Sequence, residues 1–371
     1  MRTALVYRDR LIPRSEAAFM RRQYCAFDRL APYWLGCHFD DGLADLGAAG
    51  HLLGSAGPLG AIERALFKQL GRVPSTPSLG ALNPVVIHAH FGRGGALALP
   101  IARRLGLPLV VSFHGGDATK DKHYRRQLIP TIYQRRLEAL KREAALFVCV
   151  SDFIRRRLID RGFPAEKLVV NRYGIEVEGV PEPRAPEAPP TILFVGRFVE
   201  KKGIATLLDA MALLRSAGNP LRLALVGDGP LAPLVATRAA ELGGIEQAGW
   251  LANTAVKQRM AGALALAVPS VTAKAGDAEG LPNVILEAMA AGVPVVGSDS
   301  AGIAEAVAHG QTGLVVPPGD APALAGALAR LAADPAQRQT MALAGRARAI
   351  AEFSAPAQSR RLEQILLSVV P

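Results

Sequence analysis

The sequence predicts an α/β fold with two parallel β-sheets, each covered by helices on both faces. Short apolar runs alternate with longer stretches of helical periodicity along the 371 residues, and this alternation is typical of parallel sheets buried on both sides. A segment with five prolines, Gly179 to Pro190, divides the alternation in two. The length also suits two or three domains with well-filled cores.

In the first half, alternating patterns predict five strands and three helices within a domain over residues 1–180. The predicted strands are Ala4–Tyr7, Val85–His88, Leu109–Phe113, Leu146–Val150 and Leu168–Val170. The predicted helices are Gly95–Leu105, Gln127–Glu143 and Asp152–Asp160.

The second half repeats the pattern within a predicted domain over residues 191–350. Its strands are Thr191–Val195, Leu221–Val226, Ala263–Val268 and Val293–Gly297, with helices at Gly203–Ala217, at Leu231–Leu242 and on each side of the last strand. Proline fixes φ and removes a hydrogen-bond donor, so residues 181–190 are predicted to link the domains. Residues 351–371, helical over Ala355–Val369, are expected to return to the first domain.

The charge is distributed unevenly. Residues 1–180 carry 27 basic and 16 acidic side chains, whereas residues 181–371 carry 16 of each. The whole net charge of +11 therefore lies in the first half, which indicates an anionic partner there, such as nucleic acid, a membrane surface or a phosphorylated ligand.

The cysteines and the hydropathy pattern predict a cytoplasmic protein. Cys25, Cys37 and Cys149 form no paired framework, as expected of a reduced chain. The first apolar run is broken at Arg8, before a signal peptide could form. No run of 18 uncharged apolar residues predicts a membrane span.

The segment from Asp277 to Ser298 is the most informative for chemistry. Pro282 and Asn283 suit the start of a helix that Gly292 ends. The start of a helix presents unpaired N–H groups and a positive dipole end, which bind anions. Glu279 lies just before this start and Glu287 about one turn inside it. The alternative is an ordinary helix with solvated glutamates.

Two other loops follow predicted strands. Gly196 allows a tight turn from which Arg197 and Lys202 project, and both cations can hold a phosphate. A second glycine turn contains Asp228 and Gly229. Because open α/β sheets bind ligands at the carboxyl ends of their strands, we expect these loops to lie at one site.

Five motifs, taken in this order, resemble the retaining glycosyltransferases of family 4. They are GRFVEKKG, VGDGP, EGLPNVILEAMAAGVPVV, AGIAE and the glycine turn of residues 313–320, and they cover most of residues 190–350. Glu279 and Glu287 match the E-x7-E pattern of that family. The resemblance implies the GT-B fold, in which two Rossmann-like domains face a cleft.

The first half resembles the exopolysaccharide and colanic-acid branch of the same family. The matching segments include VIHAHFG, VSFHGGD and the early Ser15-Glu16-Ala-Ala-Phe19. Two features depart from the pattern. Arg8–Arg14 lacks the usual glycine pair, and Ala301-Gly302 replaces the expected Gly-Gly.

The resemblance implies a role for each matched residue. Arg197 and Lys202 would neutralise the donor diphosphate, Glu287 would bind the ribose, and Glu279 would bind the transferred sugar. His114 would contact the sugar or the acceptor at the reacting centre. The rest of the donor pocket would comprise Gly196, Asp228, Gly229, Leu251, Gly280, Leu281, Pro282 and Asn283, and the acceptor side would comprise Ser15, Glu16, His90, Gly115 and Asp117.

The implied activity is that of a retaining hexosyltransferase in cell-surface glycan synthesis. It would use a UDP- or GDP-sugar as donor and a glycan or polyprenyl-diphosphate-linked acceptor. No cofactor or metal is expected, since the chain contains no Asp-x-Asp motif and the cations with the helix end would stabilise the leaving diphosphate.

Alternatives are a nucleotide-sugar epimerase on the same fold and a basic nucleic-acid-binding module. The chain lacks the motifs of the latter, and no nucleic-acid partner is expected. A redox Rossmann enzyme is disfavoured because no G-x-G-x-x-G follows the first strand.

Two features of the first half can each be interpreted in two ways. His88, His90 and His114 are either histidines satisfied by the fold or a metal cluster. The basic segment Lys120–Arg142 combines cations with Tyr124, Ile129, Ile132, Tyr133 and Leu137. It is either a solvated helix face or a surface that contacts the anionic inner face of the cytoplasmic membrane.

Overall fold

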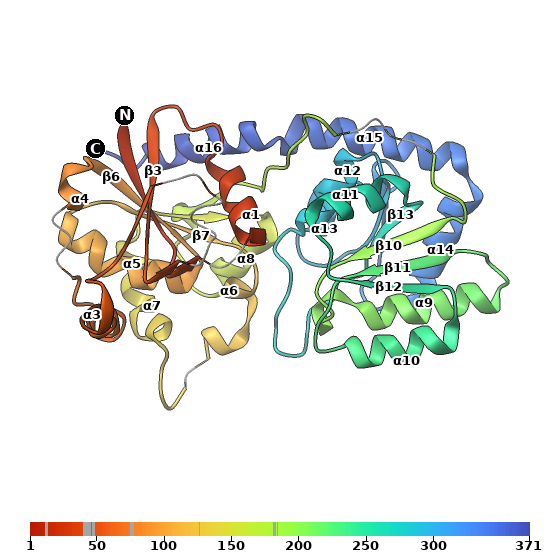
Figure 1. Ribbon diagram of the computed structural model, residues 1–371, viewed down its shortest axis with the longest axis horizontal. Helices are drawn as coiled ribbons and strands as arrows, with labels where there is room; N and C mark the ends of the chain where they lie inside the picture. The colour runs from red at the N-terminus through yellow and green to blue at the C-terminus, as the bar shows by residue number, and fades with distance from the viewer. Residues whose placement is uncertain are drawn as a thin grey trace. The chain divides into compact units, whose positions relative to one another are not determined.

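The computed structural model describes the chain except residues 12–13, 40–45, 47–48, 75–77, 126, 181–182 and 184, and also leaves the side chains of residues 14–17, 78 and 80 undescribed. It divides into two compact units (Figure 1). Unit 1 comprises Met1–Gly174 and Ala355–Pro371, and unit 2 comprises Ile175–Ser354.

Within its described residues, unit 1 is built on a seven-stranded parallel sheet. From one edge to the other the strands are β5 (Gly50–Leu52), β3 (Leu30–Gly36), β1 (Arg2–Tyr7), β6 (Pro84–His90), β7 (Leu109–Phe113), β8 (Leu146–Cys149) and β9 (Leu168–Val170). A short parallel pair, β2 (Arg10–Leu11) with β4 (His38–Phe39), lies apart. The strand order reverses direction between β1 and β6, so this sheet has its switch point there.

Helices cover both faces of this sheet. One face packs Val6 and Val86 against Met20 and Leu362 of two helices, α1 and α16. The helical segments are α1 (Arg14–Tyr24), α3 (Gly57–Leu70), α4 (Ser78–Ala81), α5 (Gly92–Leu105), α6 (Gly116–Thr119), η1 (Asp121–His123), α7 (Ile132–Glu143), α8 (Asp152–Asp160), η2 (Ala165–Lys167) and α16 (Ala355–Leu367). Helix α7 begins five residues later than predicted, because Thr131 caps it in a capping box with Gln134.

Unit 2 has a six-stranded parallel sheet among its described residues. Its order is β12 (Ile245–Gly249), β11 (Arg222–Val226), β10 (Thr191–Val195), β13 (Ala265–Val268), β14 (Val295–Ser298) and β15 (Gly313–Val316). The order again reverses, here between β10 and β13. A Rossmann-like sheet with this reversal binds its ligand at the carboxyl ends of the two strands that flank the switch point.

The helical segments of unit 2 enclose an aliphatic core on this sheet. In that core, Ile192 and Phe194 of β10 pack with Leu207 and Met211 of α9 and Leu328 of α14. The segments are η3 (Glu200–Lys202), α9 (Ile204–Ser216), α10 (Ala232–Leu242), α11 (Asn253–Gly262), α12 (Asn283–Ala290), α13 (Ile303–Ala306), α14 (Ala321–Ala333) and α15 (Pro335–Phe353). The predicted α/β class with two parallel-sheet domains is confirmed.

The chain passes between the units at Gly174–Ile175 and at Ser354–Ala355, rather than at residues 181–190 and 350–351. The described part of the proline-rich segment belongs to unit 2. There, the N–H of Glu187 donates to the carbonyl of Gly262 (3.0 Å), and Pro183 packs so closely on Gly292 that a Cβ at that glycine would lie 2.3 Å from the proline ring.

The last helix, α16, packs on unit 1, as expected. Glu363 is buried, and its Oε1 accepts hydrogen bonds from the backbone N–H groups of Asp28, Arg29 and Leu30 at 2.7–2.9 Å. The hydroxyl of Ser359 accepts a further bond from the N–H of Ala26 (3.0 Å). These bonds fix α16 to the start of β3.

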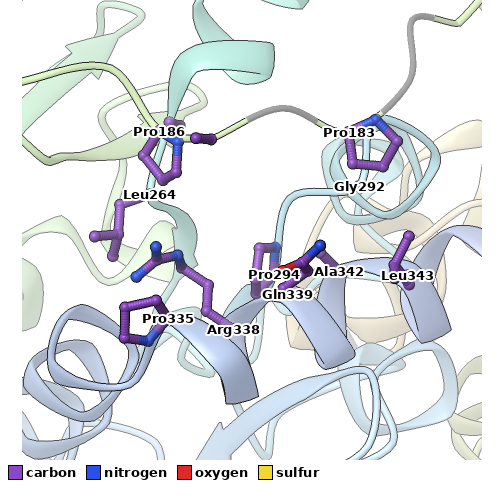
Figure 2. A pocket seen from close by; sticks show the side chains of 12 residues that line it. Pro183, Pro186, Leu264, Gly292, Pro294, Pro335, Arg338, Gln339, Ala342 and Leu343 are labelled. Carbon is purple, nitrogen blue, oxygen red and sulfur yellow. The ribbon is translucent and has the colours of Figure 1, made fainter.

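Among the described residues, no helix is long and apolar enough to cross a membrane. A cavity of about 280 Å³ lies in unit 2 under the proline-rich segment (Figure 2). It is lined by Leu264 before β13 and by Pro294 before β14, so it lies at the amino ends of these strands, away from the switch point. Arg338 in its wall donates to the carbonyl of Leu331 (2.8 Å).

Candidate functional site

The carboxyl ends of β10 and β11 are held against each other by glycines. The N–H of Gly196 donates to the carbonyl of Val226 (2.9 Å), and the N–H of Phe198 donates to that of Asp228 (2.8 Å). A Cβ at Gly227 would lie 2.0 Å from the Gly196 oxygen, and one at Gly229 would lie 2.6 Å from the Phe198 oxygen. Both glycines also have positive φ, so only glycine fits there.

The same edge continues to its neighbours on both sides. The N–H of Gly227 donates to the carbonyl of Gly249 (2.8 Å), at the end of β12. On the other side, Gly203 lies against the carbonyl of Pro269, just after β13. The predicted donor residues Gly196, Asp228, Gly229 and Leu251 therefore follow adjacent strands at one edge of the sheet. Asp228 is exposed there, with its carboxylate bonded to the N–H of Gly229 (2.7 Å).

A cluster of four charged side chains lies at the switch point. Lys201 Nζ is 3.3 Å from Asp277 Oδ1 and 3.4 Å from Glu279 Oε1, and Lys202 Nζ is 3.3 Å from the same Glu279 oxygen. The Glu279 side chain is only 12% exposed. These distances exceed the 2.7–2.9 Å of a charge-assisted hydrogen bond, so each ammonium is close enough to be attracted but is not tightly bonded.

Helix α12 begins beside this cluster without a side-chain cap. Its N-cap is Pro282, which supplies no capping bond, and Leu281 and Pro282 are buried. The side-chain oxygen of Asn283, also buried, accepts no hydrogen bond within the described part of the chain. The predicted segment Gly280–Asn283 leads into the first residue of α12, so it lies at the positive end of the helix dipole.

Glu287 and Arg197 occupy different environments. Glu287 is half-buried in α12, one turn from its start, as predicted from the sequence. Arg197 is exposed in the loop after β10. Lys202 lies next to the turn at Gly196, because its Cε is 3.4 Å from where a Cβ at that glycine would be. Lys201 and Asp277 were not predicted as site residues.

In unit 1, six side chains form one unbranched row of hydrogen bonds, which we call the histidine network. Tyr24 Oη is 2.6 Å from His88 Nδ1 and 2.7 Å from His90 Nε2. His88 Nε2 is 2.7 Å from Ser112 Oγ. His90 Nδ1 is 3.0 Å from His114 Nε2, and His114 Nδ1 is 2.8 Å from Tyr173 Oη.

The network lies at the switch point of unit 1. His88 and His90 are fully buried on β6, on the face covered by α1, and His114 is half-buried after β7. Burial lowers the pKa of His88 and of His114 to about 3, and that of His90 well below its usual value. All three rings are therefore neutral near pH 7.

Aromatic rings fix the orientation of His114. It stacks on Tyr173 (5.9 Å between centroids, 3° between planes) and on His90 (5.2 Å, 22°). The ring of Phe19 from α1 meets it edge-on at 5.5 Å. Phe19 belongs to the early motif, whereas Ser15 and Glu16 of that motif begin α1 with side chains outside the described residues.

The histidines are satisfied by the fold rather than grouped around a metal position. Each ring nitrogen of His88, His90 and His114 is hydrogen-bonded to a hydroxyl or to another imidazole. Throughout the described residues, no group of three or more metal-ligating side chains is close enough to hold an ion.

Two residues predicted for the acceptor side have internal partners. His90 is enclosed, with both nitrogens bonded within the network. Asp117 accepts backbone N–H bonds from Gly92 (3.2 Å), His114 (3.0 Å) and Gly115 (2.8 Å). Burial raises the pKa of the Asp117 carboxyl, and these bonds oppose the rise. Its observed role is to join the loops after β6 and β7.

Comparison with known proteins agrees with the fold and the motifs. The family described as Glycosyltransferase Family 4 matches residues 37–178, and the family described as Glycosyl transferases group 1 matches residues 189–334. The solved structure of Alr3699/HepE from Anabaena, in complex with UDP and glucose, has a TM-score of 0.79 and 20% identity over 99% of this chain and 100% of that one.

Two curated relatives are more similar in sequence. The amylovoran biosynthesis glycosyltransferase AmsK of Erwinia amylovora is 35% identical over 75% of this chain and 68% of its own length. The putative colanic acid biosynthesis glycosyltransferase WcaL of Salmonella typhimurium is 32% identical over 76% of this chain and 70% of its own length. The chain therefore belongs to the family 4 glycosyltransferases and is an enzyme of the hexosyltransferase type with the GT-B fold.

Proposed function

We propose that the chain transfers a sugar, with retention and without a metal, from a UDP- or GDP-sugar to a growing glycan or a polyprenyl-diphosphate-linked acceptor in exopolysaccharide synthesis. The observation that carries the proposal is the pairing of Lys201 and Lys202 with Glu279 in front of the uncapped start of α12. Cations and helix N–H groups together suit a diphosphate.

The ion pairs around Glu279 suggest an exchange of partners when the donor binds. A diphosphate carries more charge than a carboxylate, so it would draw Lys202 away from Glu279. The Glu279 carboxylate would then accept hydrogen bonds from hydroxyls of the transferred sugar. Donor binding would thus give Lys202 and Glu279 new partners without leaving either charge unpaired.

The same groups supply electrostatic catalysis. Cleavage of the glycosyl–phosphate bond increases negative charge on the leaving diphosphate, and fixed positive charge lowers the energy of that transition state. Arg197, Lys202 and the α12 dipole would take the part that a metal ion plays elsewhere. Glu287 would bind the ribose, and His114 from unit 1 would meet the sugar or the acceptor.

A panel of nucleotide sugars tests the donor assignment without an acceptor. One UDP- or GDP-sugar is expected to raise the melting temperature and to be hydrolysed slowly, and EDTA should leave the rate unchanged. The anomer of the product, followed by NMR with a disaccharide acceptor, reports retention. No stabilisation or turnover with any donor would overturn the proposal, and a rate restored only by a divalent cation would overturn metal independence.

For the acceptor we propose that unit 1 rests on an anionic lipid surface. Leu128 and Ile129 are almost fully exposed just before α7, and the nearby Arg125 side chain is 76% exposed. Helix α3 exposes Leu59, Ile62, Leu66 and Leu70 at intervals of three and four residues, so these four lie along one face.

Helix α7, which follows Leu128 and Ile129, lies beside the end of α3. Arg135 of α7 donates to Gln69 Oε1 (2.8 Å), and Arg136 donates to the carbonyl of Lys68 (3.2 Å), both at the end of α3. An exposed apolar face bordered by cations fits the interface of an anionic bilayer. Membrane contact would bring the enzyme to a lipid-linked acceptor.

A further inference from the structure

The histidine network admits only two proton arrangements. Each of its five hydrogen bonds needs one proton, and each neutral imidazole carries one N–H. If Tyr24 donates to His88, the bonds require His88, His90 and His114 all to carry their proton on Nε2. If Tyr24 donates to His90 instead, all three carry it on Nδ1. The network therefore behaves as a single two-state element.

The two arrangements present different chemistry at the half-buried end of the network. With the proton on Nε2, the Nδ1 of His114 is an acceptor, and with the proton on Nδ1 it is a donor. His88 and His90 are fully buried, whereas His114 has an accessible edge. The direction in which the Tyr24 hydroxyl of α1 donates therefore determines whether His114 Nδ1 is a donor or an acceptor.

We propose that Tyr24 is a positioning residue whose hydroxyl sets the tautomer of His114 through His90. The functional part of the inference rests on the proposed role of His114 at the reacting centre. A histidine in the wrong tautomer loses its function even when its position is unchanged, so the network would keep His114 in the productive form.

The way in which the histidine network is built supports a positioning role rather than incidental packing. Its members come from α1, β6, β7 and the segment after β9, and the bonded distances lie between 2.6 and 3.0 Å. The rings of Trp34 and Phe19 pack on His90 and His114. These contacts restrain the rings of His90 and His114 to the planes that their hydrogen bonds require.

Substitutions at the two ends of the network are expected to bias it in opposite directions. A buried N–H without a partner is rarer, and so costlier, than an unpaired acceptor. Ser112→Ala leaves His88 Nε2 without a partner, so this nitrogen should lose its proton and the network should adopt the Nδ1–H arrangement. Tyr173→Phe leaves His114 Nδ1 without its hydroxyl and should produce the Nε2–H arrangement.

Nitrogen-15 NMR of the histidine-labelled full chain distinguishes these forms, because protonated and unprotonated ring nitrogens have well-separated shifts. In Ser112→Ala, the distant His114 should be Nδ1–H, and in Tyr173→Phe, the distant His88 should be Nε2–H. Adding Tyr24→Phe to either variant should uncouple the distant histidine. Identical tautomers of His88 and of His114 in the two end variants would overturn the proposal.

Kinetics test the functional part separately. Tyr24→Phe should lower kcat by about tenfold, within the range of acid–base contributions, with little change in the KM for the donor. The matched control is Tyr133→Phe, which removes another buried phenol hydroxyl, bonded to Tyr124 at 3.2 Å. Equal kcat in Tyr24→Phe and Tyr133→Phe would overturn the positioning role. If no nucleotide sugar is turned over, the proposed function fails, while the NMR result still decides whether the network is coupled.

Discussion

Lys202 Nζ lies 3.3 Å from Glu279 Oε1 in unit 2, and Lys201 approaches the same oxygen. The lysine proposed to bind the diphosphate is therefore paired with the carboxylate proposed to bind the sugar. The two charges attract each other near the switch point.

Replacing Lys202 should affect turnover more than donor binding. Lys202→Met should lower kcat on the order of 100-fold, as for loss of one electrostatic contact to the transition state, because the charge on the diphosphate grows as the bond breaks. Steady-state kinetics with the identified donor measures the effect. Lys257→Met, at an exposed lysine paired with Glu176, is the control. Weaker donor affinity with unchanged kcat would instead indicate simple ground-state binding.

Replacing Glu287 should weaken nucleotide binding. Glu287→Ala should cost roughly 1–3 kcal/mol of affinity, the worth of a hydrogen bond to a charged group. Calorimetry with the nucleoside diphosphate and its 2′-deoxy and 3′-deoxy forms identifies the contact. At least one deoxy form should bind the unmodified enzyme less tightly than the parent nucleotide does. That deoxy form and the parent nucleotide should bind Glu287→Ala equally well. Glu241→Ala, at an exposed position of α10, should change nothing, and unaltered affinity in Glu287→Ala would contradict the ribose role.

The buried histidines should make unit 1 sensitive to acid. The pKa of His88 and that of His114 fall from 6.5 to about 3 on folding, so the unfolded chain binds more protons between these values. The free energy of unfolding should therefore decrease as the pH falls from 6.5 toward 3. Denaturant unfolding at several pH values measures this slope. His88→Gln should flatten it, whereas His51→Gln, outside the network, should not; parallel slopes in all three proteins would disprove the linkage.

The exposed apolar residues of unit 1 should determine membrane binding. Ile129→Asp and Ile62→Asp should each reduce sedimentation with vesicles containing phosphatidylglycerol at low salt, because they place a like charge on an anionic surface. Leu213→Asp tests an exposed leucine in unit 2 and should have no effect. If the unmodified protein does not sediment with anionic vesicles, the membrane proposal is wrong.

The buried strands were predicted well because apolar runs report burial on both faces. The observed bounds of β7 and β10 coincide with the predicted runs Leu109–Phe113 and Thr191–Val195. One exposed edge strand, β12, was missed for the same reason. Strand β12 reads Ile-Glu-Gln-Ala-Gly and is largely exposed, so its pairing with β11 is a tertiary effect that periodicity does not reveal. Strand β3 contains Pro32, which weakened its signal.

The site was predictable where its residues are close in sequence. Glu279, Asn283 and Glu287 surround one helix start, so spacing and helix geometry predicted their arrangement. The histidine network was not predictable, since Tyr24 is 64 residues from His88 and Tyr173 is 59 residues from His114. The VIHAHFG and VSFHGGD motifs identified the histidines, but only the packing of α1 and of the segment after β9 supplies Tyr24 and Tyr173 as their partners.

The attachment of α16 by Glu363 has a consequence for biosynthesis. Unit 1 is discontinuous, because its final helix follows the whole of unit 2 along the chain. On the ribosome, unit 2 can complete its own sheet first, whereas the Asp28–Leu30 backbone must wait for Glu363 to emerge. The first unit to be translated is thus the last to be finished, and during that delay its α16-binding surface is exposed to chaperones and proteases.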